Sequence, residues 1–164
     1  MNKTESRISI GNLRYSPFNR LLLEEVYATD LNNDTLFYAE KINAGFDFIK
    51  FLRKQFLIHS IEINNFDLSI SKDSINAPFN FQFLIDAFVS DKSQPDEKSN
   101  LQLAINRIKL NNGHLRYDVF SKPFQNPDIL DFNHVDIRNF QLNTKLYFNN
   151  PENWNCGIKN LSFD

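Results

Sequence analysis

Residues 56–71 have the sequence FLIHSIEINNFDLSIS, in which apolar and polar side chains alternate on both sides of one interruption. Such alternation is typical of a β-strand with one buried face, because successive side chains point to opposite sides of the strand. Ile63 and Phe66 are three residues apart, so an unbroken strand would place them on opposite faces. A β-bulge at Asn65 would return both side chains to one face, and Asn tolerates the backbone angles that a bulge requires.

The same pattern, apolar–x–Asn–apolar–x–apolar, recurs along the chain. Its copies occupy residues 10–15, 63–68, 137–142 and 158–163, and a related copy with one inserted residue occupies residues 110–115. We therefore predict bulges or equivalent register breaks at Asn65 and Asn139. Because bulges bend a strand and increase its twist, repeated bulges predict a curled sheet with one continuous apolar face. The irregular spacing of the copies argues against a solenoid of fixed period.

Alternation elsewhere in the chain predicts a mainly β fold with an antiparallel sheet. The predicted strands lie near residues 7–15, 20–30, 35–47, 56–71, 101–110, 114–120, 130–148 and 155–163. Asn112-Gly113 stands between two of these strands, and this dipeptide is typical of a two-residue hairpin turn. We therefore expect an eight-stranded sheet, shaped as a groove or β-taco.

Two segments change from the period of a strand to the period of a helix. The first segment contains apolar residues at Phe48, Phe51 and Leu52, and the second contains them at Phe79, Phe83, Leu84, Ala87 and Phe88. Both segments predict short helices at an end or edge of the sheet. Residues 90–100 contain no apolar side chain, so we expect a mobile loop there.

The composition fits one domain over residues 1–164, with 17 Phe, 4 Gly and a net charge of −2. The sequence pI of about 5.9 gives no basic surface for nucleic acid, which excludes that partner from our expectations. No apolar run has the length of a signal peptide or a membrane-spanning helix, so the fragment itself is expected to be soluble. The last residues, GIKNLSFD, stop within an alternating segment, and we expect the natural protein to continue.

The sequence contains no strong motif for a catalytic or metal-binding site. Each histidine (His59, His114 and His134) alternates with apolar neighbours, which favours a solvated strand position over a catalytic or metal-ligating role. Residues 30–34 begin like a calcium loop, but Thr35 and Lys41 replace the required Gly and Glu, so a β-turn is favoured. Cys156 is expected to be a small buried side chain. We therefore expect a protein that is not an enzyme, with no cofactor and no metal site.

Several blocks resemble the N-terminal region of Bacteroidetes-type TamB-like proteins of the AsmA superfamily. The blocks that carry the resemblance are LLLEEVYATD at 21–30, NDTLFYA at 33–39, NFQFLIDAF at 80–88 and IKNLSFD at 158–164. The resemblance implies a long periplasmic β-groove protein, anchored in the inner membrane in its full-length form. It also implies phospholipid transport along the groove, with acyl chains as the ligand, or assistance to the outer-membrane assembly machinery.

The predicted groove lining consists of apolar residues on four of the predicted strands. These are Ile42, Ala44, Phe46, Ile61, Ile63, Phe66, Leu68, Leu103, Ile105, Ile137, Phe140 and Leu142. We expect Phe83, Leu84 and Phe88 to pack against part of this surface. If protein covers all of the surface, the fold is instead a β-sandwich, and the alternative function is an interaction module of a surface protein that binds protein or carbohydrate. An enzyme with carboxylates assembled across strands is a third, less supported reading.

Overall fold

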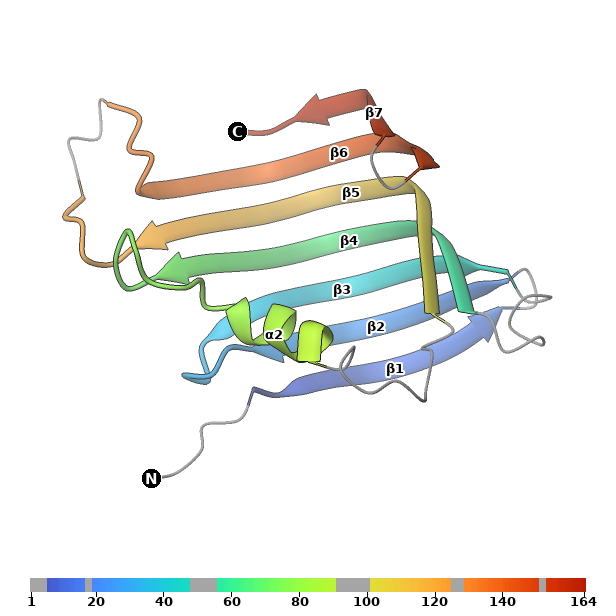
Figure 1. Ribbon diagram of the computed structural model, residues 1–164, viewed down its shortest axis with the longest axis horizontal. Coiled ribbons are helices and arrows are strands. Elements are labelled where there is room, and N and C mark those ends of the chain that lie inside the picture. The colour runs from blue at the N-terminus through green and yellow to red at the C-terminus, as the bar shows by residue number, and fades with distance from the viewer. Residues whose placement is uncertain (1–5, 17–18, 48–55, 91–100, 125–128, 151–152) are drawn as a thin grey trace.

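The computed structural model describes residues 6–16, 19–47, 56–90, 101–124, 129–150 and 153–164. This part of the chain forms seven strands and one helix (Figure 1). They are β1 (Ile8–Ser16), β2 (Arg20–Thr29), β3 (Thr35–Phe46), β4 (Phe56–Lys72), α2 (Gln82–Ser90), β5 (Leu101–Val119), β6 (His134–Asn150) and β7 (Asn153–Ser162). The mainly β prediction is therefore confirmed.

All seven strands belong to one sheet, in which their spatial order is the same as their order in the sequence. Five of the six neighbouring pairs are antiparallel, whereas β4 and β5 run parallel. The prediction of a wholly antiparallel sheet is therefore wrong. Parallel neighbours need a long crossover, and α2 lies between β4 and β5 in the chain.

The predicted hairpin at Asn112-Gly113 is also wrong, because residues 101–119 form the single strand β5. A two-residue turn of the expected type requires positive φ at both residues. Asn112 has a φ of 51°, but Gly113 does not have a positive φ. The single left-handed residue interrupts the strand without reversing it, so Leu115 continues along β4 opposite Leu68.

The two predicted helices have different outcomes. The second exists as α2, which begins at Gln82 and carries the apolar spacing that predicted it. The first, with Phe48, Phe51 and Leu52, lies outside the described residues, as does the loop at 91–100.

Asn65 and Asn139 both interrupt their strands, with φ values of 49° and 50°. The bulge predicted at Asn139 is confirmed, because Arg138 and Asn139 lie opposite the single residue His114. At Asn65 there is no bulge, since the pairing register with β3 and β5 is the same on both sides of it and only the pair at Asn65 itself is missing. The copies of the pattern at Asn12 and Asn160 do not adopt positive φ, whereas Glu25, which was not predicted, has a φ of 54°. Bulged residues leave the regular pairing of a sheet.

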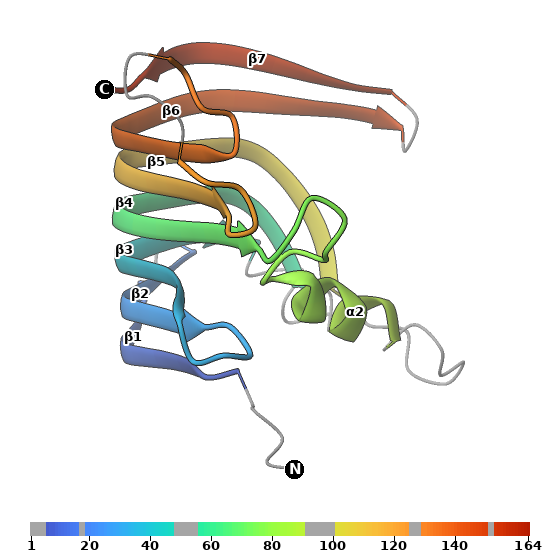
Figure 2. The ribbon, with the colours of Figure 1, turned by 90° about the vertical axis from the view of Figure 1, so that its left-hand side faces the viewer.

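The interruptions line up across β1 to β5. On every interface between these strands one pair is missing at this level while the register is the same on both sides of the gap. The skipped residues are Gly11, Glu25, Glu40, Asn65 and Asn112. We call this row the crease. Figure 2 shows that the strands change direction along their length and that α2 lies on the side toward which they bend.

Cross-strand ladders on either side of the crease are almost entirely apolar. One ladder joins Leu13, Leu23, Ile42, Ile63, Leu110, Leu142 and Leu161, and the other joins Ile8, Ala28, Phe37, Leu68, Leu115 and Ile137. Between them lie Val26, Ala39, Phe66, Gly113 and Phe140. We call this surface the apolar face, and the opposite side of the sheet the polar face.

Candidate functional site

The apolar face contains most of the residues predicted to line a groove. Ile42, Ile63, Leu68, Ile137 and Leu142 lie in its two ladders, and Ala44 pairs with Ile61 one level further from the crease. Phe66 and Phe140 flank Gly113 in the central row.

The three remaining residues of the predicted lining lie nearer one end of the sheet. Phe46 is buried, and its ring centroid lies 5.6 Å from that of Tyr15 on β1. Ile105 is half-buried at a break in the register between β4 and β5. The side chain of Leu103 lies outside the described part of the structure.

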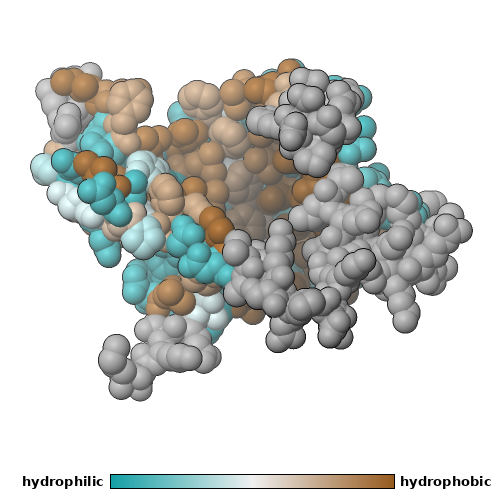
Figure 3. All heavy atoms as spheres, in the orientation of Figure 1, coloured by the Kyte–Doolittle hydropathy of each residue, from teal (hydrophilic) through white to brown (hydrophobic). Residues whose placement is uncertain are grey.

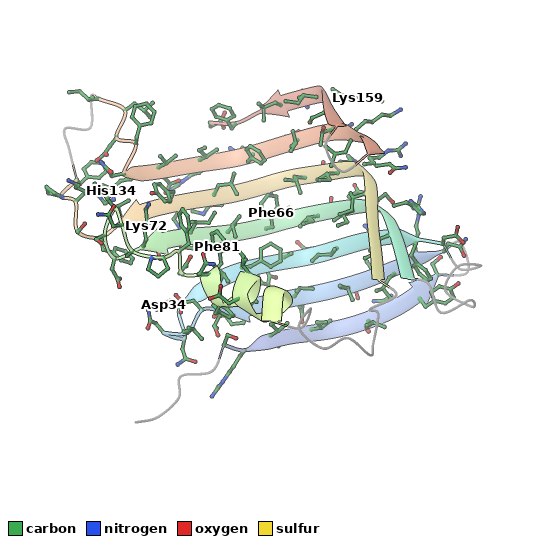
Figure 4. All side chains as sticks on the ribbon, viewed as in Figure 1. Asp34, Phe66, Lys72, Phe81, His134 and Lys159 are labelled. Atoms are coloured by element: carbon green, nitrogen blue, oxygen red, sulfur yellow. The ribbon has the colours of Figure 1, made fainter. Side chains whose placement is uncertain are left out.

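Gly113 lets two strands and an aromatic ring meet at the centre of the face. A Cβ atom on Gly113 would lie only 2.2 Å from Cζ of Phe66, so the Phe66 ring occupies the space above this glycine. Phe66 is 4% exposed, which makes it one of the few large side chains at the centre of the sheet that is nearly removed from water (Figure 4). Sequence analysis interpreted Gly113 as a turn residue and missed this contact.

Most of the apolar face remains accessible. In the described residues, the buried hydrophobic side chains are only Val26, Leu36, Ala39, Ala44, Phe46, Phe66 and Val119. Both edge strands expose their apolar residues: Leu13 on β1 is 58% exposed and Ile158 on β7 is 60% exposed. Figure 3 shows a hydrophobic surface at the centre of this side of the molecule, set back behind its surroundings.

Helix α2 lies over this side of the sheet but does not seal it (Figure 2). Among the described residues, close backbone contacts between elements join neighbouring strands only, and α2 makes none with a strand. Phe83 and Leu84 are half-buried, and the side chain of Phe88 is outside the described part.

The segment before α2 is fixed to β4 by Asn80. Its side-chain amide donates to the carbonyl oxygen of Ser69 at 2.9 Å, and its side-chain oxygen accepts from the amide of Ser71 at 3.1 Å. Pairing of β4 with β3 ends at Leu68, and Asn80 satisfies the backbone groups of Ser69 and Ser71 beyond that point. It also positions Phe79 against Tyr117 of β5, with 6.5 Å between ring centroids, so one end of the apolar face is covered by aromatic rings.

The polar face is connected by side-chain bonds between strands. Nζ of Lys109 lies 2.9 Å from Oε1 of Glu62, and the amide of Asn112 donates to the side-chain oxygen of Asn65 at 2.7 Å. His114 lies between two carboxylates, with Nδ1 at 2.8 Å from Asp67 and Nε2 at 3.0 Å from Asp136. These partners come from strands β4, β5 and β6.

A depression of about 450 Å³ lies at this cluster. It is lined by Tyr38, Asn65, Phe66, Asp67, Asn112, Gly113, His114, Arg138 and Asn139. Nε of Arg138 donates to Asp136 at 3.1 Å, and this bond, with a smaller contribution from His114, lowers the pKa of Asp136. The depression therefore combines charged and amide groups with Phe66 and Gly113 of the central row, so its lining is more polar than that of the apolar face.

Two of the three histidines do not fit the expectation of solvated strand positions. The side chains of His114 and His134 are 27% and 14% exposed, and each has a partner at both ring nitrogens. Only His59 is exposed. Alternation placed these residues on the polar side. It cannot predict which carboxylates on neighbouring strands will lie next to them. No group of three or more His, Cys, Asp or Glu side chains in the described ranges is arranged to hold a metal ion.

Two smaller expectations have opposite outcomes. Residues 30–34 form the predicted turn, since Oδ1 of Asp30 accepts from the amides of Asn32 and Asp34 at 2.8 and 3.0 Å. Cys156 was expected to be buried but is exposed, because β7 is an edge strand with one neighbour. Its Sγ lies 3.0 Å from Oγ1 of the buried Thr144.

No protein-family model matches this chain, and a search of curated proteins gives no significant match. Within the described residues, no helix has the length and apolar character needed to cross a membrane. The chain is thus defined by its architecture, a bulged seven-stranded mixed sheet with one accessible apolar face.

Proposed function

We propose that the apolar face shelters the acyl chains of phospholipids, as part of a longer cell-envelope protein. The observation that carries this proposal is the pair of apolar ladders that extend across the sheet while most of their side chains remain partly exposed. An accessible apolar surface of this extent is unusual for a soluble protein and marks a site for an apolar ligand or partner.

The chemistry of the surface suits acyl chains better than a ligand with a defined polar pattern. Acyl chains need apolar area without fixed hydrogen-bond partners, and the ladders supply Leu, Ile, Val, Ala and Phe almost exclusively. Interruptions at the crease would curve this surface into a groove, and our proposal requires that concave shape. Headgroups would remain in water at the open side.

The resemblance to TamB-like proteins of the AsmA superfamily supports the same function. On this reading the parent protein is anchored in the inner membrane and extends into the periplasm. Its role is phospholipid transport toward the outer membrane or assistance to the assembly of outer-membrane proteins. The protein acts without catalysis.

The alternative function is an interaction module that binds a protein or a carbohydrate. The polar depression favours this alternative, because Tyr38, Arg138 and the amides of Asn112 and Asn139 line it together. Binding there would leave the apolar face to be covered by protein. The two functions therefore differ in whether a charge on the apolar face is tolerated by the fold.

The test compares one charge on each face of β6. Phe140→Asp puts a carboxylate on the apolar face, and Gln141→Asp puts the same group on the adjacent, exposed position of the polar face. We expect both variants to melt close to the wild type, because Phe140 is only half-buried. Only Phe140→Asp should lose lipid, measured by native mass spectrometry with lipid extraction and by binding of a fluorescent phospholipid. In the full-length parent this substitution should block lipid passage.

Two outcomes would reject the proposal. Unfolding of Phe140→Asp beside a stable Gln141→Asp would indicate a closed core, since burial of an unpaired charge costs several kcal/mol. A wild-type chain that carries no phospholipid and binds no fluorescent phospholipid would reject lipid sheltering directly. Phe66→Asp is the internal reference for a buried position, and it should unfold in either case.

A further inference from the structure

His134, the first residue of β6, has a hydrogen-bond acceptor at each ring nitrogen. Its Nδ1 lies 2.9 Å from Oδ1 of Asp118, and its Nε2 lies 2.8 Å from the carbonyl oxygen of Lys122. A carboxylate and a carbonyl oxygen can only accept, so both nitrogens must carry a hydrogen for both bonds to form. Only the imidazolium form has two N–H groups, and the geometry therefore selects the charged ring.

One of the two acceptors lies within a strand, and the other lies outside it. Asp118 lies near the end of β5, within the sheet, whereas Lys122 lies in the segment that leaves it. The ring of Phe124 lies 5.8 Å from that of His134. His134 thus connects residues 122–124 to the end of the sheet, where Figure 4 shows it, while the amides of Phe120 and Ser121 donate to the carbonyl oxygens of Lys72 and Asp73. Residues 120–124 carry two strongly exposed rings, with Phe120 at 66% and Phe124 at 68% exposure.

We propose that His134 is a pH-sensitive clasp: its charged ring fixes residues 122–124, which follow the backbone bonds of Phe120 and Ser121 to the end of β4, and loss of one ring proton releases the carbonyl of Lys122. The carboxylate of Asp118 is the stronger acceptor, so the hydrogen on Nδ1 is retained and Nε2 is deprotonated. A lone pair on Nε2 then faces the lone pairs of the Lys122 oxygen. The bond from the ring to Lys122 is replaced by a repulsive contact, whereas the backbone bonds from Phe120 and Ser121 to the carbonyl oxygens of Lys72 and Asp73, at 3.0 and 2.9 Å, remain.

The surroundings favour the charged ring. The bond to Asp118 is the largest cause that raises the pKa of His134 above its ordinary value of 6.5, followed by the bond to the Lys122 carbonyl. Desolvation opposes them, and the charge of Asp131 supports them. The charges that act on the His134 ring are Asp118 on β5 and Asp131 in the segment between β5 and β6. Arg116 and Asp136 pair two residues further along these strands, and at the end of β4 the carbonyl oxygen of Lys72 accepts from the amide of Phe120.

The direction of the pH dependence follows from the raised pKa. The clasp is fully formed below the ordinary pKa of 6.5 and is lost as the pH rises through the higher pKa of the folded state.

His114 provides the internal comparison. Its ring also bridges two acceptors, but Asp67 and Asp136 belong to strands that the sheet already holds beside β5. Loss of the His114 ring should therefore leave residues 122–124 in place.

The experiment is an NMR titration of the wild-type chain, following the three histidine rings and the backbone amides of Ser121, Lys122 and Phe124. We expect His134 to titrate above pH 6.5 and the three amides to shift with the same midpoint. His134→Gln should abolish the pH-dependent shifts of these amides, and His114→Gln should preserve them. Asp118→Asn should lower the midpoint of His134.

A His134 midpoint at or below 6.5 would overturn the proposal. So would amide shifts that do not follow the His134 midpoint, or that persist in His134→Gln. Because the wild-type titration alone decides the first two points, the test does not depend on the folding of any variant.

Discussion

The two faces of the sheet achieve order by different means. On the polar face, neighbouring strands exchange side-chain bonds, such as Lys109 with Glu62 and Asn112 with Asn65. On the apolar face, the ladders lack such bonds, and the nearly dry positions are those around Phe66 at the centre and at Ala44 and Phe46 nearer one end. Individual exposed pairs contribute little, but many of them along five strands specify the register. The apolar face is thereby left accessible to a ligand.

The largest effect is expected at the centre of the apolar face. Phe66→Ala removes the ring that packs over Gly113 and should lower the free energy of unfolding by about 3 kcal/mol, measured by urea denaturation. Phe120→Ala is the matched control, because the same atoms are removed from a side chain that is 66% exposed. Equal losses in the two variants would contradict the view that Phe66 is the centre of the fold.

An intermediate effect is expected at the crease, where the alternation of side chains between the two faces is interrupted. Asn65 has a φ of 49°, and a left-handed backbone costs a residue such as Ala about 1–2 kcal/mol. Asn65→Ala should therefore destabilise by about that amount. Asn65→Gly, which loses the same side-chain bonds without the backbone penalty, should be destabilised less. Thermal melts of the two variants measure the difference, and identical values would mean that the side-chain bonds dominate.

The smallest effect is expected on the polar face. The pKa of Asp136 is lowered, so this carboxylate contributes stability above its ordinary pKa of 3.8 and loses it as the pH falls through the lower pKa of the folded state. Its side chain is 46% exposed, which limits the contribution at neutral pH to less than about 1 kcal/mol. Asp136→Asn should flatten the acid limb of stability against pH. If Asp136→Asn lowered the free energy of unfolding by several kcal/mol at pH 7, bonds on the polar face would be the main source of stability.

The sequence predicted the local features of the fold well. Alternation located the strands, and the three-residue spacing at Ile63 and Phe66 predicted the interruption at Asn65, although not that it would lack a bulge. Most of the predicted lining residues could be placed on one face for the same reason. The spacing did not predict the left-handed Glu25, because Glu has no particular tendency to adopt that conformation. The spacing also gave no sign that the interruption in one strand would lie directly opposite the interruption in its neighbour.

What the sequence alone determined is which side chains share a face, because that depends only on the period of two residues and its interruptions. The tertiary structure decided which strands are neighbours and in which direction they run. Asn112-Gly113 has the local chemistry of a turn, yet pairing with β4 made it an interruption within a strand, with Phe66 above the glycine. In the same way, the carboxylates around His114 and His134 came from other strands. Hydrogen bonding between distant segments fixes these contacts, and no local pattern records them.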